Sequence, residues 1–512
     1  MLVVFRADAS PAIGGGHVMR CITLADELRN LGAECCFGCA PRTLESVPAL
    51  ARSGHRYVEL PDSLEAAALS TAFPGGCDWL VVDHYGWNAE MEAACRPWAK
   101  RIFVIDDLAN RRHDCDLLLD QTLGRRASVY RDLVSHNCAI VVGSKYALLR
   151  PEFAERRLRS PIRKEPARAR RVLVSMGLSD PANLTPIIMK GILQSGLALS
   201  VDVVLGPSAP GLPAVKKLIE QHRTMFTLHI GADAATLADL LVECDFGVGA
   251  GGSSAWERCC LGVPAIIVIV AENQREAAGE LARVGAALLV GDVEQVSPTV
   301  IANAVKSFVR DSRLRAEISG QAVRVCDGRG VGRIAMRVFP ARAANEKPVW
   351  LRPAASSDVE TILAWQSQPE TRRFGRTRTV PTAEEHAAWF SARLRNPSSL
   401  LSVIVLDGTD AGTLRLDRLD ENSYEVSIVV SNQFHGQGVG LAALELARRL
   451  VPEAWLRAEI LPGNIRSEAL FTRAGYSPQG YGWRSIEPLV RHFEKVDVNL
   501  SPVDSNRANQ LD

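Results

Sequence analysis

Short apolar runs alternate with helical patterns over roughly the first 335 residues. The runs LVVFRAD, AECCFGCA, WLVVDHY, RIFVIDD, DLLLDQ and AIVVGSKY are apolar without alternation, which is typical of strands buried on both faces of a parallel sheet. The segment 18–31 has an apolar helical face and is followed by Gly32, a common helix stop. This order of elements predicts a doubly wound α/β fold.

The pattern is interrupted at 155–171, ERRLRSPIRKEPARARR, where eight of seventeen residues are basic and two are proline. Such a run could bind nucleic acid, but it contains no aromatic residues and strands resume directly after it, so an interdomain linker is the favoured interpretation. The later runs RVLVSMG, LSVDVVLG, FTLHIG, DFGVGAGG and AIIVIVA predict a second sheet. We therefore expect two Rossmann-like half-domains, 1–155 and 168–336, that face each other across a ligand-binding cleft.

A second break occurs at 337–349, and the pattern after it is different. The runs VWLRPA, LLSVIVLD, AGTLRLDRLD, SYEVSIVV and AWLRAEIL alternate apolar and polar residues and lie close together, as antiparallel strands do. Helical patterns occur at 356–366 and 383–395. The sequence thus predicts a separate α+β domain over 349–500, and the polar segment 501–512 is expected to be a disordered tail.

Composition excludes several classes of function. The chain has 512 residues and a net charge of +1, so it has no overall attraction to nucleic acid or anionic membrane. Arg6 and Asp8 interrupt the first apolar run, and the longest apolar stretch, 261–271, is about half of what a membrane-spanning helix needs. A cytoplasmic location without membrane insertion is expected. The twelve cysteines, including the pair Cys36 and Cys39, are irregularly spaced and are interpreted as buried structural residues.

The stretch IGGGHVMR contains a glycine-rich turn between the first strand and the first helix. Its glycines, Gly14 to Gly16, form neither a dinucleotide fingerprint nor a P-loop. His17 would be the first or second helical residue, where the positive end of the helix dipole favours a neutral imidazole that can act as a general base. The alternative is a histidine that only bonds its own loop.

A second glycine cluster, GAGGSS at 249–254, again lies between a strand and a helix. Its backbone amides and hydroxyls could hold a diphosphate. Glu257 follows about one turn into the helix and could bind ribose hydroxyls, or it could be a solvated helix residue. Asn273 and Gln274 are expected at the end of a later strand, facing the ligand.

Taken together, five segments resemble the UDP-2,4-diacetamido-2,4,6-trideoxy-β-L-altropyranose hydrolases of pseudaminic acid biosynthesis. These segments are RADASPAIGGGHVMRCITLADEL, VVDHYGW, VIDDLANRRHDCDLLLDQ, GSKYALLRPEF and GAGGSSAWERCCLGVPAIIVIVAENQ. The resemblance covers residues 1–335 and implies a glycosyltransferase-B-like fold and hydrolysis at the anomeric carbon with release of UDP. It implies that His17 activates water and that Tyr85 is catalytic. The implied substrate-binding residues are Gly14, Gly15, Gly16, Arg20, Asp83, Gly251, Gly252, Ser253, Glu257, Asn273 and Gln274.

No metal is expected, since the acidic pairs Asp106–Asp107 and Asp114–Asp116 match a metal motif only by composition. Asp106 and Asp107 are expected to order the active-site loop or a neighbouring side chain.

In the third domain, the stretch HGQGVG follows a strand and opens a helix. It resembles the acetyl-CoA loop of the GCN5-related N-acetyltransferase (GNAT) family, with His435 where that family has Gln or Arg. The later NIRSEALFTRAGY resembles a second motif of the same family. The implied acetyl-CoA-binding residues are His435, Gly436, Gln437, Gly438, Val439, Gly440 and Asn464. Phe471 replaces the tyrosine that many members use as general acid.

The segments AWQSQPETRRF and TAEEHAAWF resemble N-acetyltransferases that modify a 4-amino sugar nucleotide in the same pathway. Glu425 could act as a base through water or could pair with a nearby arginine. His386 and Trp389 could line the acceptor site, although core packing is favoured for Trp389.

These resemblances imply a bifunctional enzyme that acetylates a UDP-4-amino sugar with acetyl-CoA and then hydrolyses the product. The expected partners are the UDP-sugar, acetyl-CoA and other enzymes of the nonulosonic acid pathway, with no nucleic acid. The alternative is a UDP-sugar glycosyltransferase with a degenerate acetyl-CoA-sensing domain.

Overall fold

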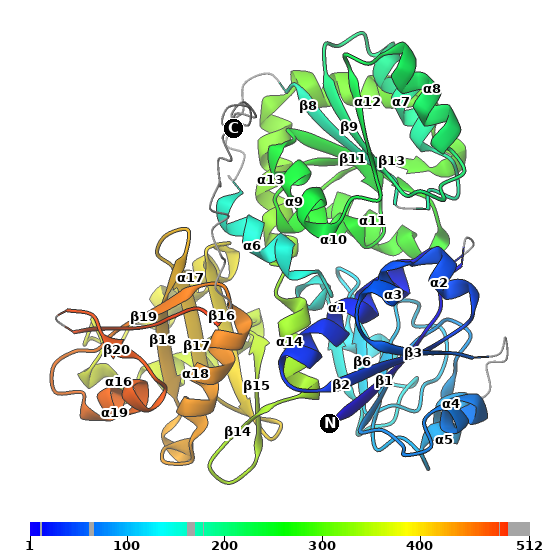
Figure 1. Ribbon diagram of the computed structural model, residues 1–512. Helices are drawn as coiled ribbons and strands as arrows, with labels where there is room; N and C mark the ends of the chain where they lie inside the picture. Colours follow the sequence, from blue (N-terminus) through cyan, green and yellow to red (C-terminus); the bar gives the residue numbers. More distant parts are fainter. Residues whose placement is uncertain (11–12, 61–65, 161–168, 178, 481, 490–512) are drawn as a thin grey trace, which may run out of the picture.

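The chain folds around three sheets that follow one another in sequence (Figure 1). The computed structural model describes residues 1–10, 13–60, 66–160, 169–177, 179–480 and 482–489. Residues 161–168 of the expected linker and the expected tail 501–512 lie outside this range. In Figure 1 the first two sheets form a lower, blue lobe and an upper, green lobe, and the third sheet lies to their left. The predicted fold class is confirmed: two Rossmann-like lobes are followed by an α+β domain.

The first lobe has a seven-stranded parallel sheet in the order β3-β2-β1-β4-β5-β6-β7. Its strands are β1 (Leu2–Ala7), β2 (Glu34–Cys39), β3 (Arg56–Glu59), β4 (Trp79–Asp83), β5 (Ile102–Ile105), β6 (Leu117–Asp120) and β7 (Ala139–Val142). Its helices are α1 (Gly16–Asn30), α2 (Arg42–Ser46), α3 (Ala49–Arg52), α4 (Ala66–Ala72), α5 (Ala89–Cys95), η1 (Ala127–Tyr130) and η2 (Ser144–Tyr146). The strand order reverses between β1 and β4, and ligands bind at such switch points.

The second lobe repeats this topology with six parallel strands in the order β10-β9-β8-β11-β12-β13. They are β8 (Arg171–Ser175), β9 (Ser200–Leu205), β10 (Phe226–Ile230), β11 (Phe246–Ala250), β12 (Ala265–Ile269) and β13 (Leu288–Asp292). The helices are α7 (Thr185–Gln194), α8 (Leu212–Gln221), α9 (Ala234–Glu243), α10 (Ser254–Cys260), η3 (Glu272–Gln274), α11 (Arg275–Arg283), η4 (Val293–Gln295), α12 (Pro298–Arg310) and α13 (Ser312–Val325). Its switch point lies between β8 and β11.

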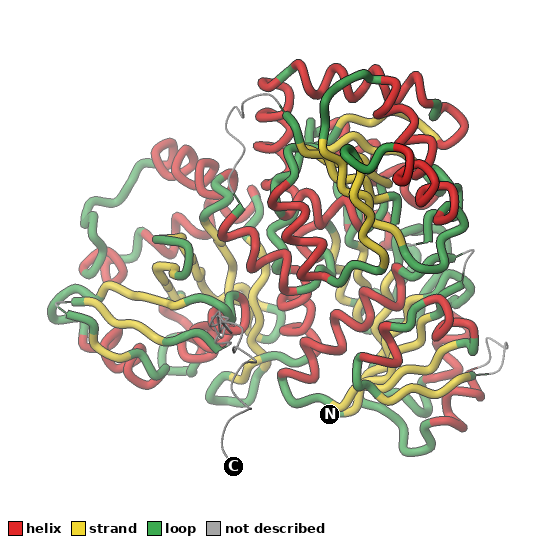
Figure 2. The backbone as a smooth tube through the Cα atoms, turned by 45° about the horizontal axis from the view of Figure 1, so that its top comes forward, coloured by secondary structure: helices red, strands yellow, loops and turns green. Residues whose placement is uncertain are grey.

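Two helices pack outside the lobe that their sequence position suggests. Helix α6 (Pro151–Arg159) begins within the first expected half-domain, yet Phe153 is buried in the core of the second lobe. Helix α14 (Gly330–Val338) follows the second lobe but buries Ile334 and Ala335 against α1 in the core of the first. Met336 on the same helix belongs to the core of the third domain. The lobes therefore exchange elements, and α14 packs between the first lobe and the third domain (Figure 1). Figure 2 shows the same molecule from another side, with the helices in red around the yellow strands.

The third sheet is mixed, with the order β14-β15-β16-β17-β18-β19-β21-β20. Its strands are β14 (Ala341–Arg342), β15 (Pro348–Pro353), β16 (Ser399–Leu406), β17 (Thr409–Arg418), β18 (Ser423–Val430), β19 (Trp455–Glu459), β20 (Ser477–Pro478) and β21 (Trp483–Ile486). The helices are η5 (Ser356–Asp358), α15 (Val359–Gln366), α16 (Pro369–Arg373), α17 (Ala383–Arg395), η6 (Asn432–Phe434), α18 (Val439–Leu450) and α19 (Ile465–Arg473). Strands β18 and β19 pair in parallel, whereas the other neighbours are antiparallel. The break expected at 337–349 contains β14, so this sheet begins earlier than the pattern suggested.

The structure also bears on cysteines, metals and membranes. All twelve cysteines are free thiols, and eleven of them are buried, which agrees with their interpretation as structural residues. Within the described residues no cluster of three or more histidine, cysteine or acidic side chains could hold a metal ion. No described helix is both long enough and apolar enough to cross a bilayer.

Candidate active sites

His17 is the second residue of α1, and its imidazole contacts the last residue of β4. The Nδ1 atom lies 2.6 Å from Oδ1 of Asp83, which is fully buried. The strand register pairs Ala7 with Asp83, so the loop after β1 and the end of β4 meet at the switch point of the sheet. When Asp83 accepts a hydrogen bond from Nδ1–H, the lone pair of a neutral imidazole lies on Nε2. The pair thus presents a fixed tautomer of the kind that a general base requires.

Arg20, one turn after His17, neutralises the buried carboxylate. Its Nε and Nη2 atoms donate to the two oxygens of Asp83, each at 2.6 Å. Burial alone would raise the pKa of Asp83, but the charges of Arg20 and His17 hold it well below its usual range. Asp83 therefore remains ionised throughout the working pH range. The resemblance implies that Arg20 binds substrate, whereas in the structure its guanidinium is engaged by Asp83 and, at 3.3 Å, by Asp107.

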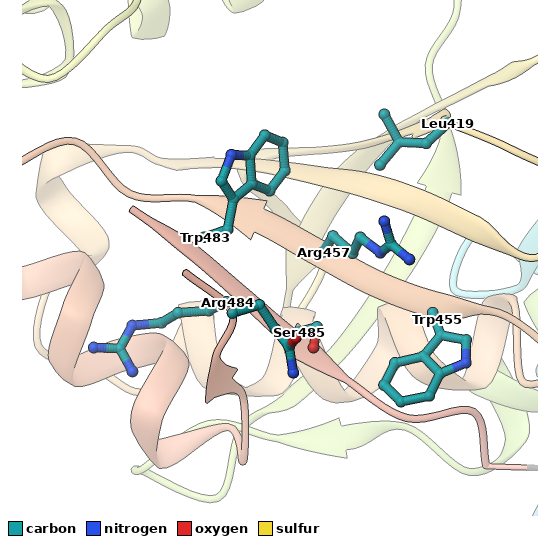
Figure 3. A pocket seen from close by; sticks show the side chains of 7 residues that line it. Leu419, Trp455, Arg457, Trp483, Arg484 and Ser485 are labelled. Carbon is teal, nitrogen blue, oxygen red and sulfur yellow. The ribbon is translucent and has the colours of Figure 1, made fainter. Parts of the chain in front are cut away.

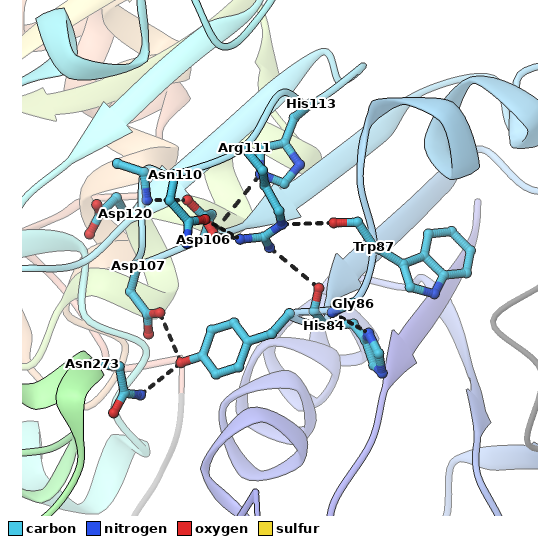
Figure 4. Close-up of polar contacts among 12 residues, drawn as sticks. His84, Gly86, Trp87, Asp106, Asp107, Asn110, Arg111, His113, Asp120 and Asn273 are labelled. Atoms are coloured by element: carbon cyan, nitrogen blue, oxygen red, sulfur yellow. Dashed lines mark hydrogen bonds and ion pairs between the residues drawn. The ribbon is translucent and has the colours of Figure 1, made fainter.

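Tyr85 connects this cluster to the second lobe. Its hydroxyl donates to Asp107 at 2.9 Å and accepts a hydrogen bond from Nδ2 of Asn273 at 2.8 Å (Figure 4). The rings of Tyr85 and His17 meet edge to face with centroids 4.6 Å apart. Burial and the nearby Asp107 raise the pKa of Tyr85, so it acts as a neutral donor. Asp107 thus orders neighbouring side chains, as expected from the sequence.

Asp106 orders the loop behind Tyr85. It accepts a hydrogen bond from Arg111 at 2.7 Å, and Arg111 in turn donates to the carbonyl oxygens of Trp87 and His84 (Figure 4). Tyr130 also donates to Asp106, at 2.9 Å. This network fixes the backbone that holds Tyr85. Sequence reasoning did not find Arg111, because its partners lie in loops 5 to 27 residues away.

The two glycine turns face each other across the lobes. Gly14 has φ +79°, a conformation that favours glycine, and its amide donates to Ser10 O. Gly15 is the N-cap of α1. A Cβ atom at Gly16 would lie 3.9 Å from Oγ of Ser253, so the first turn opens onto the second. The residues that the resemblance assigns to sugar chemistry and to diphosphate binding are thereby brought together.

The second turn lies where β11 ends and α10 begins. Gly251 is buried, Gly252 is half-buried, and the Ser253 side chain makes no helix-capping bond. A Cβ at Gly252 would lie 3.0 Å from Nε2 of Gln274, so the side-chain amide of Gln274 lies beside the turn. Asn273 and Gln274 belong to the short helix η3 rather than to the end of a strand, because β12 stops at Ile269. Asn273 nevertheless reaches Tyr85 of the first lobe, and Gln274 lies beside the second glycine turn.

Glu257 lies on α10 behind the turn. Its carboxylate is 3.6 Å from Nη2 of Arg150, and its side chain is 17% exposed. Burial raises its pKa above the ordinary value, and the two nearby arginines offset this only in part. Glu257 also borders a small hollow whose wall includes Leu237 and Leu241. At about 10 Å³ this hollow holds no more than a water molecule, so it is not itself a nucleoside pocket.

In the third domain, the glycine-rich loop connects β18 to α18. Gly438 has φ +81° and is the N-cap of α18, so the free amides of the first helical turn point out of the loop. A Cβ at Gly438 would lie 2.7 Å from the Ala344 backbone. The Nε2 atom of His435 donates to Val430 O at 2.9 Å, which fixes the loop to the end of β18. These amides suit a pyrophosphate group, the part of acetyl-CoA that the resemblance assigns to them.

The remaining members of this loop and Asn464 have defined positions. Gly436 also has a positive φ, Gln437 accepts a backbone hydrogen bond from Ala344, and Val439 and Gly440 begin α18. Asn464 caps α19 by accepting a bond from the Ser467 amide at 3.2 Å. Its side-chain oxygen is therefore engaged in capping the helix.

Glu425 shares an arginine with a second carboxylate. Nη2 of Arg376 lies 2.6 Å from Glu425 on β18 and 2.5 Å from Glu459 on β19. The strands pair in parallel only up to Glu425 and Arg457, so the two carboxylates flank the point where β18 and β19 separate. Glu425 thus has the arginine partner that the sequence analysis gave as one alternative. The sequence offered no signal for Arg376 or Glu459, since they are distant along the chain.

His386 is enclosed beneath α17, whereas the Trp389 ring contacts the guanidinium groups of Arg393 and Arg415. His386 is 2% exposed and packs between Trp389 and Phe390 on α17. Burial lowers the pKa of His386, so this imidazole is neutral. The expectation that His386 lines an acceptor site is corrected: the helix layer over β16 encloses its side chain.

Comparison with known proteins supports a fused sugar-nucleotide enzyme. Residues 349–477 match the family model of the acetyltransferase (GNAT) domain. The UDP-2,4-diacetamido-2,4,6-trideoxy-beta-L-altropyranose hydrolase of Campylobacter jejuni is 25% identical over 289 residues, 56% of this chain and 97% of its own length. The uncharacterized protein MJ1062 of Methanocaldococcus jannaschii is 20% identical over 486 residues, 93% of this chain and 96% of its own.

The spore coat polysaccharide biosynthesis protein SpsG of Bacillus subtilis is 28% identical over 211 residues, 41% of this chain and 60% of its own. The chain therefore combines a segment similar to a UDP-sugar hydrolase with a GNAT domain, as the resemblances predicted. The similarity to MJ1062 covers both parts.

Proposed function

We propose that the chain catalyses two consecutive steps on one UDP-sugar. The GNAT domain acetylates the 4-amino group of UDP-4-amino-4,6-dideoxy-β-L-AltNAc with acetyl-CoA. The two lobes then hydrolyse UDP-2,4-diacetamido-2,4,6-trideoxy-β-L-altropyranose to UDP and the free sugar. The observation that supports this best is the contact of His17 with buried Asp83, opposite the Gly251–Ser253 turn.

In the hydrolytic step, Nε2 of His17 takes a proton from water as the water oxygen bonds to the anomeric carbon. The bond from that carbon to the diphosphate oxygen breaks, and its electron pair leaves with UDP. The amides of the Gly251–Ser253 turn would stabilise the charge that grows on the diphosphate. Asp83 stabilises the imidazolium that forms. Tyr85 and Asn273 would hold the lobes closed so that the sugar lies between the two turns.

In the acetyl transfer, the loop 435–440 would bind the cofactor, which supplies an acetyl thioester when bound. The carboxylates of Glu425 and Glu459 would bind the ammonium form of the acceptor. In this structure the Arg376 guanidinium occupies the position of that ammonium group between them. Glu425 would accept the proton that the amine loses, directly or through water.

An NMR time course with the UDP-4-amino sugar and acetyl-CoA tests both steps. We expect acetylation at the 4-amino group, followed by appearance of UDP and the free sugar. His17→Asn should stop UDP release while the acetylated UDP-sugar accumulates and UDP still binds. Glu425→Gln should slow acetylation while hydrolysis of added diacetamido substrate continues. Transfer of the sugar to an acceptor other than water would instead identify a glycosyltransferase, and acetyl-CoA binding without turnover would identify a sensor.

A further inference from the structure

A groove of about 650 Å³ lies in the GNAT domain, outside the residues assigned so far. Its walls are formed by Leu419, Trp455, Arg457, Gln479, Trp483, Arg484 and Ser485 (Figure 3). Along β19, Leu456 and Ala458 are buried in the core with α18, so the alternate residues Trp455, Arg457 and Glu459 lie on the opposite face of the sheet. The groove is therefore open on the face that α18 does not cover.

The lining combines flat aromatic surface with an exposed cation. Trp455 and Trp483 are both half-buried, and each leaves part of its indole accessible. Arg457 lies between them in Figure 3 and is exposed. Among the described residues Arg457 has no hydrogen-bond or ion-pair partner, whereas Arg352, Arg376 and Arg415 of this domain are held by carboxylates; its nearest recorded charge effect is a lowering of the pKa of Asp420. Arg484 extends away from the two indoles in the same view.

The groove lies beside the carboxylates and extends toward the end of β18 that is opposite to the acetyl-CoA loop. The loop follows Val430 at the end of β18, whereas Leu419 precedes the first residue of that strand, Ser423. Trp483 pairs with Glu459 across β21 and β19, so the groove adjoins the carboxylate pair directly. The groove thus extends from the level of Glu459, where Trp483 lies, to the level of Ser423, where Trp455 lies, and the Trp455 end is the one farther from the cofactor loop.

We infer that this groove binds the uridine diphosphate portion of the acceptor, a second nucleotide site distinct from the Gly251–Ser253 turn. Pyrimidine bases stack on indole rings, and an unpaired guanidinium suits a diphosphate. Trp455 and Glu459 are four residues apart on β19, about 13 Å at the usual strand rise. A nucleoside diphosphate with its sugar is extended enough to reach from the indoles to Glu425 and Glu459. The inference rests on the proposed function, because it takes a UDP-amino sugar as the acceptor.

Titration calorimetry of the full chain with UDP tests the second site. We expect two sites per chain, of which Trp483→Ala weakens one by about tenfold or more and Glu257→Ala weakens the other. Trp350→Ala is the matched control, a half-buried tryptophan of the same domain on β15, four strands away from β19, and should change neither site. A single site that is unaffected by Trp483→Ala would overturn the inference. Retained acetyl-CoA binding shows that the variant domain is folded, and Arg457→Glu provides an independent variant.

Kinetics separate this inference from the proposed function. Trp483→Ala and Arg457→Glu should raise the KM for the UDP-amino sugar about tenfold, with the KM for acetyl-CoA and the rate of UDP release from diacetamido substrate unchanged. If both variants acetylate the UDP-amino sugar as well as the parent does, the groove does not bind the acceptor, and the proposed function is unaffected. A second UDP site without acetyl transfer to this sugar would support the groove and refute the acceptor. Acetylation of a peptide amine, with no second UDP site, would refute both.

Discussion

Arg329 and Glu453 form a bidentate ion pair in which both side chains are at least 93% buried. Arg329 is the N-cap of α14, and Glu453 lies between α18 and β19. The pair therefore joins the two-lobed unit to the GNAT domain at a buried site. Because removing one member of such a pair leaves the other as an uncompensated buried charge, this contact is a strong determinant of stability.

Glu453→Ala should lower the free energy of unfolding of the step that separates these parts by about 3–5 kcal/mol. Denaturant unfolding monitored by tryptophan fluorescence, together with thermal unfolding in a calorimeter, measures the change in the free energy of unfolding. The matched control is Glu317→Ala, which removes an exposed pair with Arg313 and should cost less than about 1 kcal/mol. Equal effects of the two variants would show that the buried pair does not hold the interface.

Asp83→Asn should reduce UDP release by about 10³–10⁴-fold, because asparagine does not fix the imidazole tautomer or stabilise an imidazolium. UDP binding at the Gly251–Ser253 turn should persist, which calorimetry can check. Asp78→Asn is a suitable control, since Asp78 precedes the same strand and pairs with exposed Lys100. A rate within tenfold of the parent enzyme would remove Asp83 from the proposed mechanism.

Glu257→Gln should have opposite effects on stability and binding at neutral pH. Since folding raises the pKa of Glu257, the folded state binds this proton more tightly, and stability falls as pH rises from the ordinary value of 4.5 through the raised one. The variant should therefore be more stable than the parent above that window and equal to it below. The variant should bind UDP more weakly than the parent at neutral pH. In the parent, UDP affinity should decline as acid protonates Glu257, whereas the affinity of the variant should not show this decline. Thermal melts and UDP titrations over pH 4–8 measure both; parallel pH curves for the two proteins would contradict the assignment.

Arg376→Met should lower the KM for the amino-sugar acceptor about five- to tenfold, because the guanidinium no longer competes with the ammonium group for Glu425 and Glu459. The KM for acetyl-CoA should not change. Arg378→Met, an exposed arginine of the same segment, is the control. A rise in acceptor KM would mean that Arg376 helps to bind the acceptor rather than to occupy its place.

The sequence predicted the features that depend on local order. The strand–turn–helix pattern around Gly14–His17 and the pattern around Gly251–Glu257 were both found, because each motif is continuous. The contacts between distant segments were not predicted: nothing near Glu425 indicates that Arg376, 49 residues earlier, bridges it to Glu459. The helical pattern of α14 is likewise the same whichever lobe it packs against.

Because α14 contributes to the cores of both the first lobe and the third domain, the chain has no clean point at which these parts can be cut apart. A cut near residue 340 would separate the acetyltransferase from the lobes on paper, but Met336 would lose its apolar surroundings and Arg329 its counterion. A cut before α14 would instead remove part of the core of the first lobe, including Ile334. The acetyltransferase domain is therefore not joined to the lobes by a free linker but shares a helix and a buried ion pair with them. A domain that replaced it would have to present the same surface to α14.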